Sequence, residues 1–424
     1  MRELLGFLVG VRGNLRASLW TEPMWGIPFH LYWPFFTVYM FHLGVLDVQI
    51  GLLLALGRLL MVFSALLGGI ITDKFGRRLT TLVGDVVSWS IPTAIWMVSQ
   101  NFWWFLAAAL IHGMVQVSSI SWECLWIDDI SEDGEKIKHF FNWLYISGLL
   151  AVFFAPIAGL FIARYSLVPV VRVLLGFAFV SMTAKFIVMY VFTTETERGK
   201  ERIKATKDIP FSTLLLGYKE VFMQILRNKN MRRALSLQSL LQVTLLISTT
   251  FFALYVTQNL GLPDEFLAYF PILRSAVMLM FLFFIQNHLY VFGERKVMFT
   301  GIGFFLVSLA VLLVSPEGGW VLPAIYIFIE ACAAALLFPR VDTLAANSMD
   351  PKERARIRSL FNVVILAVVS PFAYFAGVLS EMDRRLPFVL NACVFVIMIF
   401  FIASGRSKQT SDNAGERAKG FNPS

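Results

Sequence analysis

The sequence has few charged residues and very few cysteines. Charged residues make up 15% of its 424 positions and hydrophobic residues 58%, whereas a soluble domain has about 25% charged and roughly 45–50% apolar residues. This balance excludes an ordinary soluble fold. Cys124, Cys332 and Cys393 lie in apolar runs and form no CxxC pair, which excludes a disulfide framework and a cysteine-based zinc site. The five histidines also lack metal-ligand spacing, so we expect no metal and no cofactor.

Motifs for nucleotide and hydrolytic chemistry are also missing. The chain contains no GxxxxGK(S/T) phosphate loop, which argues against transport driven by ATP. It contains no HExxH and no GxSxG motif, so we do not expect an enzyme. A net charge of +8 remains. We attribute this charge to membrane topology and expect no nucleic-acid partner.

Twelve apolar runs are long enough to cross a membrane as helices, because a transmembrane helix needs about 20 apolar residues. The runs are 21–43, 48–72, 79–99, 102–127, 139–163, 168–193, 233–259, 265–290, 297–315, 320–345, 359–381 and 386–404. The sequence therefore predicts an all-α membrane protein with twelve transmembrane helices. Arg2, Arg12 and Arg16 lie among apolar residues before the first run, which predicts an amphipathic N-terminal arm on the membrane surface.

The distribution of Lys and Arg sets the orientation. With the N-terminus in the cytoplasm, 28 of the 36 Lys and Arg residues lie in cytoplasmic segments, four lie in outside loops and four lie within the runs. By the positive-inside rule, both termini are cytoplasmic. We expect an integral protein of the plasma membrane that contacts lipids and acts as a monomer.

One long polar stretch divides the chain into two halves. The predicted parts are a six-helix half at 1–193, a cytoplasmic linker at 194–232, a second six-helix half at 233–404 and a disordered cytoplasmic tail at 405–424. The halves are similar, because a basic loop ends in Phe141-Asn142 in the first and in Phe361-Asn362 in the second. Such internal repeats are typical of transporters, in which the solute site lies between the repeats.

The stretch Gly69-Ile70-Ile71-Thr72-Asp73-Lys74-Phe75-Gly76-Arg77-Arg78 resembles the GxxxD(R/K)xGRR motif of the major facilitator superfamily. Every position of that motif is filled, and the stretch lies in a predicted cytoplasmic turn. Thr194–Gly199 is similar to a sequence of sugar porters, without its proline, and Asp350–Arg354 is similar to the superfamily's loop between spans 10 and 11. The resemblance in layout covers nearly the whole chain. It implies two pseudo-symmetric six-helix bundles around a central cavity that opens alternately to either side.

The resemblance also implies a latch between the halves. In it, Asp73 would face helix N-termini and the cationic Arg354, Arg356 and Arg358 of the second half, and the pairing would break when the cytoplasmic side opens. The residues of this predicted latch are Gly69, Asp73, Gly76, Arg77, Arg78, Arg354 and Arg358. The alternative is a loop that only anchors topology.

Charged residues within the runs are candidate solute contacts, because a buried ion in a membrane is costly. Arg58 and Arg274 lie at nearly equivalent depths on the second and eighth runs, and Glu330 lies near the middle of the tenth. The resemblance implies that all three runs line the cavity. We expect an anion between the two arginines, held by charge-assisted hydrogen bonds. The alternative is permanent pairing of Arg274 with Glu330 and of Arg58 with Glu123 or a backbone carbonyl.

Polar residues add further candidates. His112, Gln116 and Glu123 share one face of the fourth run, Gln242 lies on the seventh, and His30 lies near the middle of the first. The predicted solute-binding residues are Arg58, Arg274, Glu330, His30, His112, Gln116 and Gln242, and the candidates for proton coupling are Glu330 and Glu123. The alternative for the polar faces is hydrogen bonding that only holds the helices together.

The leading functional prediction is a secondary active transporter that moves a small organic solute by alternating access. An anionic solute is favoured, and protons are the candidate coupling ion. The alternatives are an exporter of amphipathic cations, drugs or lipids on the same scaffold, and a non-transporting membrane receptor. Leu110 stands where proton/drug antiporters have an arginine, which counts against that subgroup. The polar tail 405–424 is too short to be a signalling domain, which counts against a receptor.

Overall fold

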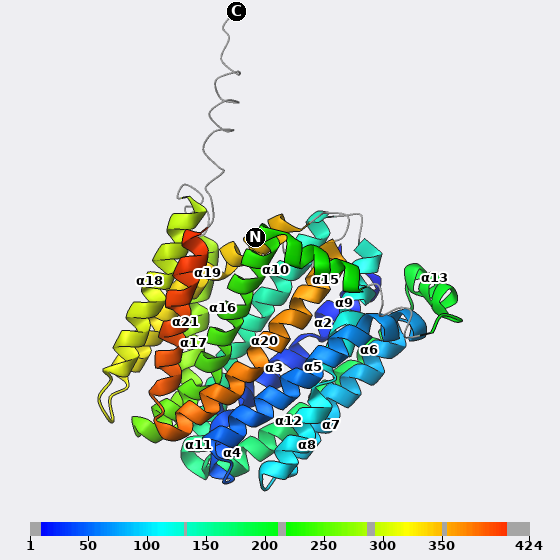
Figure 1. Cartoon of the computed structure of the whole chain (residues 1–424). Helices are drawn as coiled ribbons and strands as arrows, with labels where there is room; N and C mark the ends of the chain where they lie inside the picture. The colour runs from blue at the N-terminus through cyan, green and yellow to red at the C-terminus, as the bar shows by residue number, and fades with distance from the viewer. Residues whose placement is uncertain (1–9, 131–133, 211–217, 286–292, 350–353, 405–424) are drawn as a thin grey trace, which may run out of the picture.

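The computed structural model describes residues 10–130, 134–210, 218–285, 293–349 and 354–404. Within these ranges every regular element is helical (Figure 1). Eleven helical segments are long and apolar enough to cross a membrane, and they coincide with the second to the twelfth predicted run. The prediction of an all-α membrane protein is therefore confirmed for the described part of the chain.

The helices follow one another with short connections. In the first half they are α2 (Gly13–Thr21), α3 (Pro23–Tyr32), α4 (Phe36–His42), α5 (Asp47–Phe75), α6 (Arg77–Asp85), α7 (Ile91–Val98), α8 (Phe102–His112), α9 (Val115–Ile130), α10 (Gly134–Ala151), α11 (Ala155–Tyr165) and α12 (Leu167–Phe192). The polar segment contains α13 (Glu197–Thr206) and α15 (Tyr218–Arg227). In the second half they are α16 (Lys229–Leu254), α17 (Tyr269–Met280), α18 (Glu294–Leu313), α19 (Val321–Ser348), α20 (Arg354–Met382) and α21 (Leu386–Ala403).

Several spans consist of two helices joined by a turn of another helix type. The π-helical turn Val86–Ser90 joins α6 to α7, and another, Tyr255–Asn259, extends α16. The 3-10 turn Val152–Phe154 joins α10 to α11. Proline follows two of these junctions, at Pro92 and Pro156, because its missing N–H is tolerated in the first turn of a helix.

The first predicted run, 21–43, is divided into α3, the 3-10 turn Trp33–Phe35 and α4. Together these pieces form one continuous helical stretch, 23–42, which is not among the eleven described segments that are long and apolar enough to cross a membrane. Pro28 lies inside α3 and leaves the carbonyl of Met24 without a helical donor. The Ser181 hydroxyl of α12 donates to that carbonyl at 2.7 Å. Pro34 lies in the 3-10 turn that interrupts this run, whereas Pro28 lies inside α3 and a neighbouring span satisfies the carbonyl that it frees.

The predicted surface arm before this run is only partly described, and its described part packs into the protein. Leu15 and Leu19 of α2 belong to a buried cluster with Trp126 of α9 and Phe140 of α10. The Asn14 side chain donates to the backbone carbonyl of Thr194 at 3.0 Å and accepts from the Thr194 N–H at 2.8 Å. The described part of the arm, α2, is therefore covered by protein on its apolar side, and its position on the membrane surface stays a prediction.

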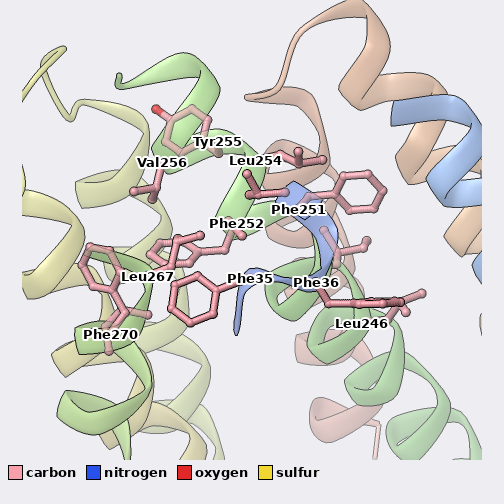
Figure 2. Close-up of a cluster of buried hydrophobic side chains, with 14 of the residues drawn as sticks. Phe35, Phe36, Leu246, Phe251, Phe252, Leu254, Tyr255, Val256, Leu267 and Phe270 are labelled. Atoms are coloured by element: carbon pink, nitrogen blue, oxygen red, sulfur yellow. The ribbon is translucent and has the colours of Figure 1, made fainter. Parts of the chain in front are cut away.

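A single large core cluster contains side chains from both halves of the chain. Figure 2 shows Phe35 and Phe36, from the first predicted run, beside Phe252 and Leu246 of α16 and Phe270 of α17. Phe35 is fully buried and Phe36 is 8% exposed. These aromatic side chains hold the two halves together near one end of the helices.

Helices α5 and α20 form the most extensive contact between the halves and lie side by side in Figure 1. Two glycines allow it. A Cβ atom on Gly51 would lie 2.6 Å from the carbonyl oxygen of Ala373 and 2.8 Å from the Cα of Gly377. The two backbones therefore meet at a distance that no larger residue permits.

Candidate functional site

Arg274 and Glu330 form a bidentate ion pair inside the second half. Arg274 Nε donates to Glu330 Oε2 at 2.9 Å, and Nη2 donates to Oε1 at 3.3 Å. The carboxylate side chain is 7% exposed and the guanidinium side chain 30% exposed. The pair joins α17 to α19, so the alternative pairing considered for Arg274 is the one that the structure contains. One edge of the arginine stays accessible.

Two tyrosines flank this pair. Tyr326, one helical turn before Glu330 on α19, is buried and stacks on Phe252 of α16 at a centroid distance of 5.4 Å. Tyr145 of α10 is 44% exposed and lies close enough to Arg274 for the two groups to interact electrostatically. Because α10 belongs to the first half, Tyr145 places a side chain of that half near the Arg274–Glu330 pair of the second half.

Arg58 of α5 has no counter-charge among the described residues. Its Nε atom is buried without a hydrogen-bond partner, and within the described ranges no ion pair or hydrogen bond reaches its side chain. The alternative partners considered for Arg58, Glu123 and a backbone carbonyl, are therefore not its partners here. The charge of Arg58 acts on His112 of α8. A buried guanidinium without a carboxylate is unfavourable inside a membrane unless an anion joins it.

His112 has a structural role that its sequence pattern did not suggest. Its Nδ1 lies 2.6 Å from the carbonyl oxygen of Ser88, which Pro92 leaves without a helical N–H donor. The ring also meets Trp89 and Trp96 edge-on, at centroid distances of 4.7 and 5.6 Å. His112 therefore stabilises the junction between α6 and α7 from inside the first half.

Gln116 and Glu123 of α9 both face the second half. The Asn362 amide of α20 donates to Gln116 Oε1 at 2.8 Å. Glu123 is exposed and interacts electrostatically with Arg358, also on α20. Near the middle of the helices, the Ser370 hydroxyl of α20 donates to the carbonyl of Ala55 at 2.8 Å, one turn before Arg58. Gln116 and Glu123 therefore lie along the contact between the halves, whereas His112 lies inside the first half.

The remaining predicted solute contacts are less constrained. Gln242 is exposed on α16, although that span is the most buried of the eleven. His30 is half-buried and meets the ring of Phe29 edge-on at a centroid distance of 5.2 Å. Neither side chain has a contact that brings it to Arg58 or Arg274. Their roles in solute binding stay predictions.

The loop that contains the motif Gly69–Arg78, which we call the motif loop, has the tight turn expected for it. Gly76 has φ +86°, and a Cβ atom there would lie 2.5 Å from Glu195 Oε2, so only glycine fits. The Glu195 carboxylate accepts from the backbone N–H groups of Arg77 at 3.1 Å and Arg78 at 3.0 Å, which caps the first turn of α6. Gly69 lies in the last third of α5, next to Gly68, which approaches α9 closely.

The charged residues of the loop pair within the first half and the linker. Arg77 Nε bonds Asp128 at 3.0 Å, and Arg78 donates to the carbonyl of Tyr190 at 2.7 Å. Asp73 lies 3.5 Å from Arg77 and 2.9 Å from Arg202 of α13. Figure 1 shows α13 beside the start of α6, away from α20.

The predicted latch partner of Asp73 is therefore not the one found. Asp73 pairs with Arg202 of the linker, because α13 folds back over the loop, whereas Arg358 interacts with Glu123. The side chains of Arg354 and Arg356 lie outside the described residues. A latch between Asp73 and the second half stays a prediction for a different conformation.

Sequence reasoning missed the polar contacts at the opposite end, where α5 begins. Arg384 pairs with Asp47 at 3.0 Å, and the Ser380 hydroxyl donates to the same carboxylate at 2.7 Å. His42 lies 3.5 Å from Asp264, which again joins the two halves. We call these four charged or titratable residues and Ser380 the Asp47 end. The sequence offered one signal for these contacts: isolated charged residues at the ends of spans, in loops that contain few other charges.

Three comparisons bear on this arrangement. A family model described as "MFS_1 like family" matches residues 30–379. The uncharacterized MFS-type transporter YqjV of Bacillus subtilis (strain 168) is 26% identical over 129 residues, which are 30% of this chain and 31% of that protein. The match thus spans about a third of that relative's length.

Solved structures of similar fold cover nearly the whole chain. The nucleoside transporter NupG has a TM-score of 0.71 at 14% identity, over 93% of this chain and 100% of that one. The human organic anion transporter MFSD10 has a TM-score of 0.62 at 14% identity, over 92% and 98% of the two chains. At such identities the likeness shows the fold alone.

Proposed function

The chain belongs to the MFS_1 like family, and we propose that it moves a small organic anion across the membrane by alternating access, coupled to protons. Its relatives are transporters and not enzymes. The eleven apolar helical segments of its described residues and its family make it an integral membrane protein. The class of function, membrane transport, follows from the family. The solute, the coupling ion and the mechanism are the proposal.

The proposed architecture is two six-helix bundles, at 1–193 and 233–404, joined by the linker 194–232 around a central cavity. The interrupted helices α3 and α4 would supply the twelfth span. The contacts between α5 and α20 and between α4 and α16 would form part of the surface along which the two bundles meet. We propose that both termini are cytoplasmic, in a plasma-membrane protein that acts as a monomer in contact with lipids.

The proposal of an anionic solute rests on one observation, which is that Arg58 has no counter-charge among the described residues. An arginine stays ionised in almost any protein environment, so its charge has to be balanced when water is excluded. The described residues offer Arg58 no carboxylate. A carboxylate or phosphate on the solute would provide the missing charge and accept bidentate hydrogen bonds.

The surroundings of Arg58 support a solute site between the halves. Ala55, one turn earlier on α5, accepts a hydrogen bond from Ser370 of the second half. A solute group bound at Arg58 would therefore lie next to a contact that must break when the halves separate. Solute binding and conformational change would be linked in this way.

Arg274 and Glu330 would supply the proton coupling. While Glu330 is ionised, it occupies the guanidinium of Arg274. A proton on Glu330 would weaken that pair and free Arg274 to bind the solute anion together with Arg58. The proton and the anion would then bind cooperatively, which is the requirement for coupled movement.

The name of one protein of similar fold agrees with this proposal: MFSD10 is called an organic anion transporter. That name describes the relative and shows the range of the scaffold. The rival on the same scaffold is an exporter of amphipathic cations, for which exposed Glu123 would be the contact.

Binding by the purified chain tests the solute class. A panel of anionic, neutral and cationic solutes is measured against the parent, Arg58→Gln and Arg58→Lys. We expect an anion that the parent binds to lose about 1.5–3 kcal/mol of affinity in Arg58→Gln, the value of a charge-assisted hydrogen bond, and to be partly restored in Arg58→Lys. A parent that binds only cations, or an Arg58→Gln variant that binds the anion normally, would overturn the proposal.

A further inference from the structure

Two arginines from different helices hold the end of α21. Arg233, in the second turn of α16, donates from Nε to the carbonyl oxygen of Phe401 at 2.8 Å and from Nη2 to that of Ile402 at 3.0 Å. Arg295, in the first turn of α18, donates from Nη2 to the carbonyl oxygen of Ala403 at 2.7 Å. These three carbonyls belong to consecutive residues, so the two guanidinium groups lie close together at the end of one span.

The contact with α21 uses only part of each guanidinium. The last carbonyls of a helix have no donor within the helix, and cations near them are favourable. However, a helix end offers only about half a negative charge, whereas Arg233 and Arg295 each bring a full positive charge. A guanidinium also has more N–H donors than these bonds use. Both arginines therefore keep charge and donors for a further acceptor, and their bonds to α21 fix where that acceptor has to lie.

More cations surround these two arginines, with little to neutralise them. The first five residues of α16 contain three cations, and the first three residues of α18 contain two. We call these five residues the α21 cation cluster: Lys229, Arg232, Arg233, Arg295 and Lys296. All are exposed except Arg233, which is half-buried. Glu294 is the only carboxylate in the two stretches, and no described carboxylate forms an ion pair with any member of the cluster.

Apolar side chains are exposed on the same two spans, next to the cluster. Helices α18 and α21 lie side by side at the edge of the bundle (Figure 1) and pack through the stacked rings of Phe305 and Phe395, at a centroid distance of 4.4 Å. Beside this contact Phe304 is 41% exposed, Val396 is 45% exposed and Phe400 is 69% exposed. Phe400 immediately precedes the carbonyls that the two arginines bind. Cations at the ends of spans with an apolar surface next to them fit the two parts of an anionic phospholipid.

We propose that the α21 cation cluster binds an anionic phospholipid from the membrane leaflet at this end of the spans. The headgroup phosphate lies at Arg233 and Arg295, because guanidinium groups bind phosphate oxygens through bidentate, charge-assisted hydrogen bonds. The acyl chains lie along Phe304 and Phe400. A free phosphate would satisfy the cations but leave the apolar surface uncovered, which favours a lipid as the occupant. The lipid joins α16, α18 and α21, and its binding needs neither the proposed solute nor a coupling proton.

Lipid binding by the purified full-length chain tests the proposal without a transport assay. The chain is freed of lipid in a neutral detergent and titrated with phosphatidylglycerol or phosphatidylcholine of the same acyl chains, and native mass spectrometry counts the bound lipid. The parent should prefer phosphatidylglycerol by about tenfold or more, and the preference should weaken as ionic strength rises. Arg233→Gln/Arg295→Gln should lose most of this preference. Equal binding of the two lipids by the parent, or an unchanged preference in this variant, would overturn the proposal.

Two paired variants decide whether the position of the charges matters. Lys204→Gln/Lys207→Gln removes two exposed positive charges from the linker and should keep the preference of the parent. An equal loss in this control would mean that only net charge counts and would overturn the assignment to the cluster. Arg232→Gln/Lys296→Gln covers a failure of the first variant to fold, because neither side chain has a hydrogen bond within the described part of the chain. This variant should also lose preference, and an unchanged preference would contradict the proposal.

Two further measurements distinguish a lipid from a free anion. Inorganic phosphate, at the same ionic strength as a chloride control, should not displace phosphatidylglycerol from the parent. Displacement by phosphate beyond the chloride control would mean a site for a free anion and would overturn the lipid as occupant. Phe400→Ala should weaken binding of phosphatidylglycerol, whereas Phe192→Ala should not. Phe192 is the matched control, because it is 71% exposed on α12 of the first half. Equal binding by these two variants would show that the acyl chains do not lie along Phe400.

Discussion

Asp47 at the start of α5 and Arg384 between α20 and α21 form an ion pair across the two halves, although they lie 337 residues apart. Arg384 Nε donates to Asp47 Oδ2 at 3.0 Å, and Nη2 reaches Oδ1 at 3.4 Å. The carboxylate side chain is 1% exposed. The backbone N–H of Val48 also donates to Glu381 of the second half at 3.3 Å. The Asp47 end is thus fastened by several polar contacts in this conformation.

The first prediction concerns this fastening. Arg384→Gln leaves the buried Asp47 carboxylate without its counter-charge, which costs about 3–5 kcal/mol. The conformation in the structure should therefore lose population to one that is open at the Asp47 end. Distances between spin labels on the ends of α5 and α20 measure the shift. Arg164→Gln, which changes an exposed arginine at the end of α11, is the control, and equal distance distributions in both variants would contradict the prediction.

The second prediction concerns the close approach of α5 and α20. Gly377→Ala puts a Cβ atom 2.8 Å from the carbonyl oxygen of Asp47, where only backbone atoms could give way. We expect the two helices to separate and the protein to lose transport activity or thermal stability. Gly303→Ala in α18 is the matched control, because a Cβ atom there meets nothing within 4 Å. A Gly377→Ala protein as active and as stable as Gly303→Ala would show that the contact is not needed.

The third prediction concerns the cap on α6. Glu195→Ala removes the acceptor for the N–H groups of Arg77 and Arg78, and loss of a helix cap costs about 0.5–2 kcal/mol. Hydrogen exchange at these two amides should become faster, with a matching fall in melting temperature. Glu201→Ala, an exposed acid on α13, should change neither quantity. Unchanged exchange in Glu195→Ala would mean that the cap has no energetic role.

The fourth prediction separates two partners of Asp73. In this conformation Asp73 pairs with Arg202, so Asp73→Asn and Arg202→Gln should both loosen α13 from the motif loop. Cross-linking between cysteines placed on α5 and α13 would report the loss. If Asp73 also pairs with the second half in another conformation, Asp73→Asn alone should redistribute the conformational states. Identical state distributions in the two variants would remove the latch between the halves.

The fifth prediction concerns Glu330. Glu330→Gln cannot take up a proton at this position, so accumulation driven by a pH gradient in proteoliposomes should be abolished. Exchange of solute across the membrane needs no net proton movement and should persist. The same variant leaves Arg274 without its carboxylate partner, so anion affinity should stay equal or rise. Normal accumulation in Glu330→Gln would remove this residue from the coupling mechanism.

Sequence reasoning predicted the eleven apolar segments that the described residues contain, but it found only part of the site. The pairing of Arg274 with Glu330 was one of two alternatives, because two opposite charges on neighbouring spans suggest each other. The isolation of Arg58, the bond from His112 to Ser88 and the pairing of Asp73 with Arg202 depend on which way each helix is rotated. The rotation of each helix is set by packing and by backbone carbonyls on other helices that proline leaves without a donor. The residues of one run contain no information about these contacts.

The sequence by itself determined that this chain is a bundle of membrane helices with a motif loop after the second predicted run. Hydropathy and turn chemistry are local properties, summed over about 20 neighbouring residues, so they can be read along the chain. The tertiary structure alone decided which charges are balanced. Asp47 and Arg384 neutralise each other, Glu22 pairs with Lys185, and no described residue pairs with Arg58. Charge balance inside a membrane cannot be read along the chain, because it depends on distances between residues that are far apart in the sequence.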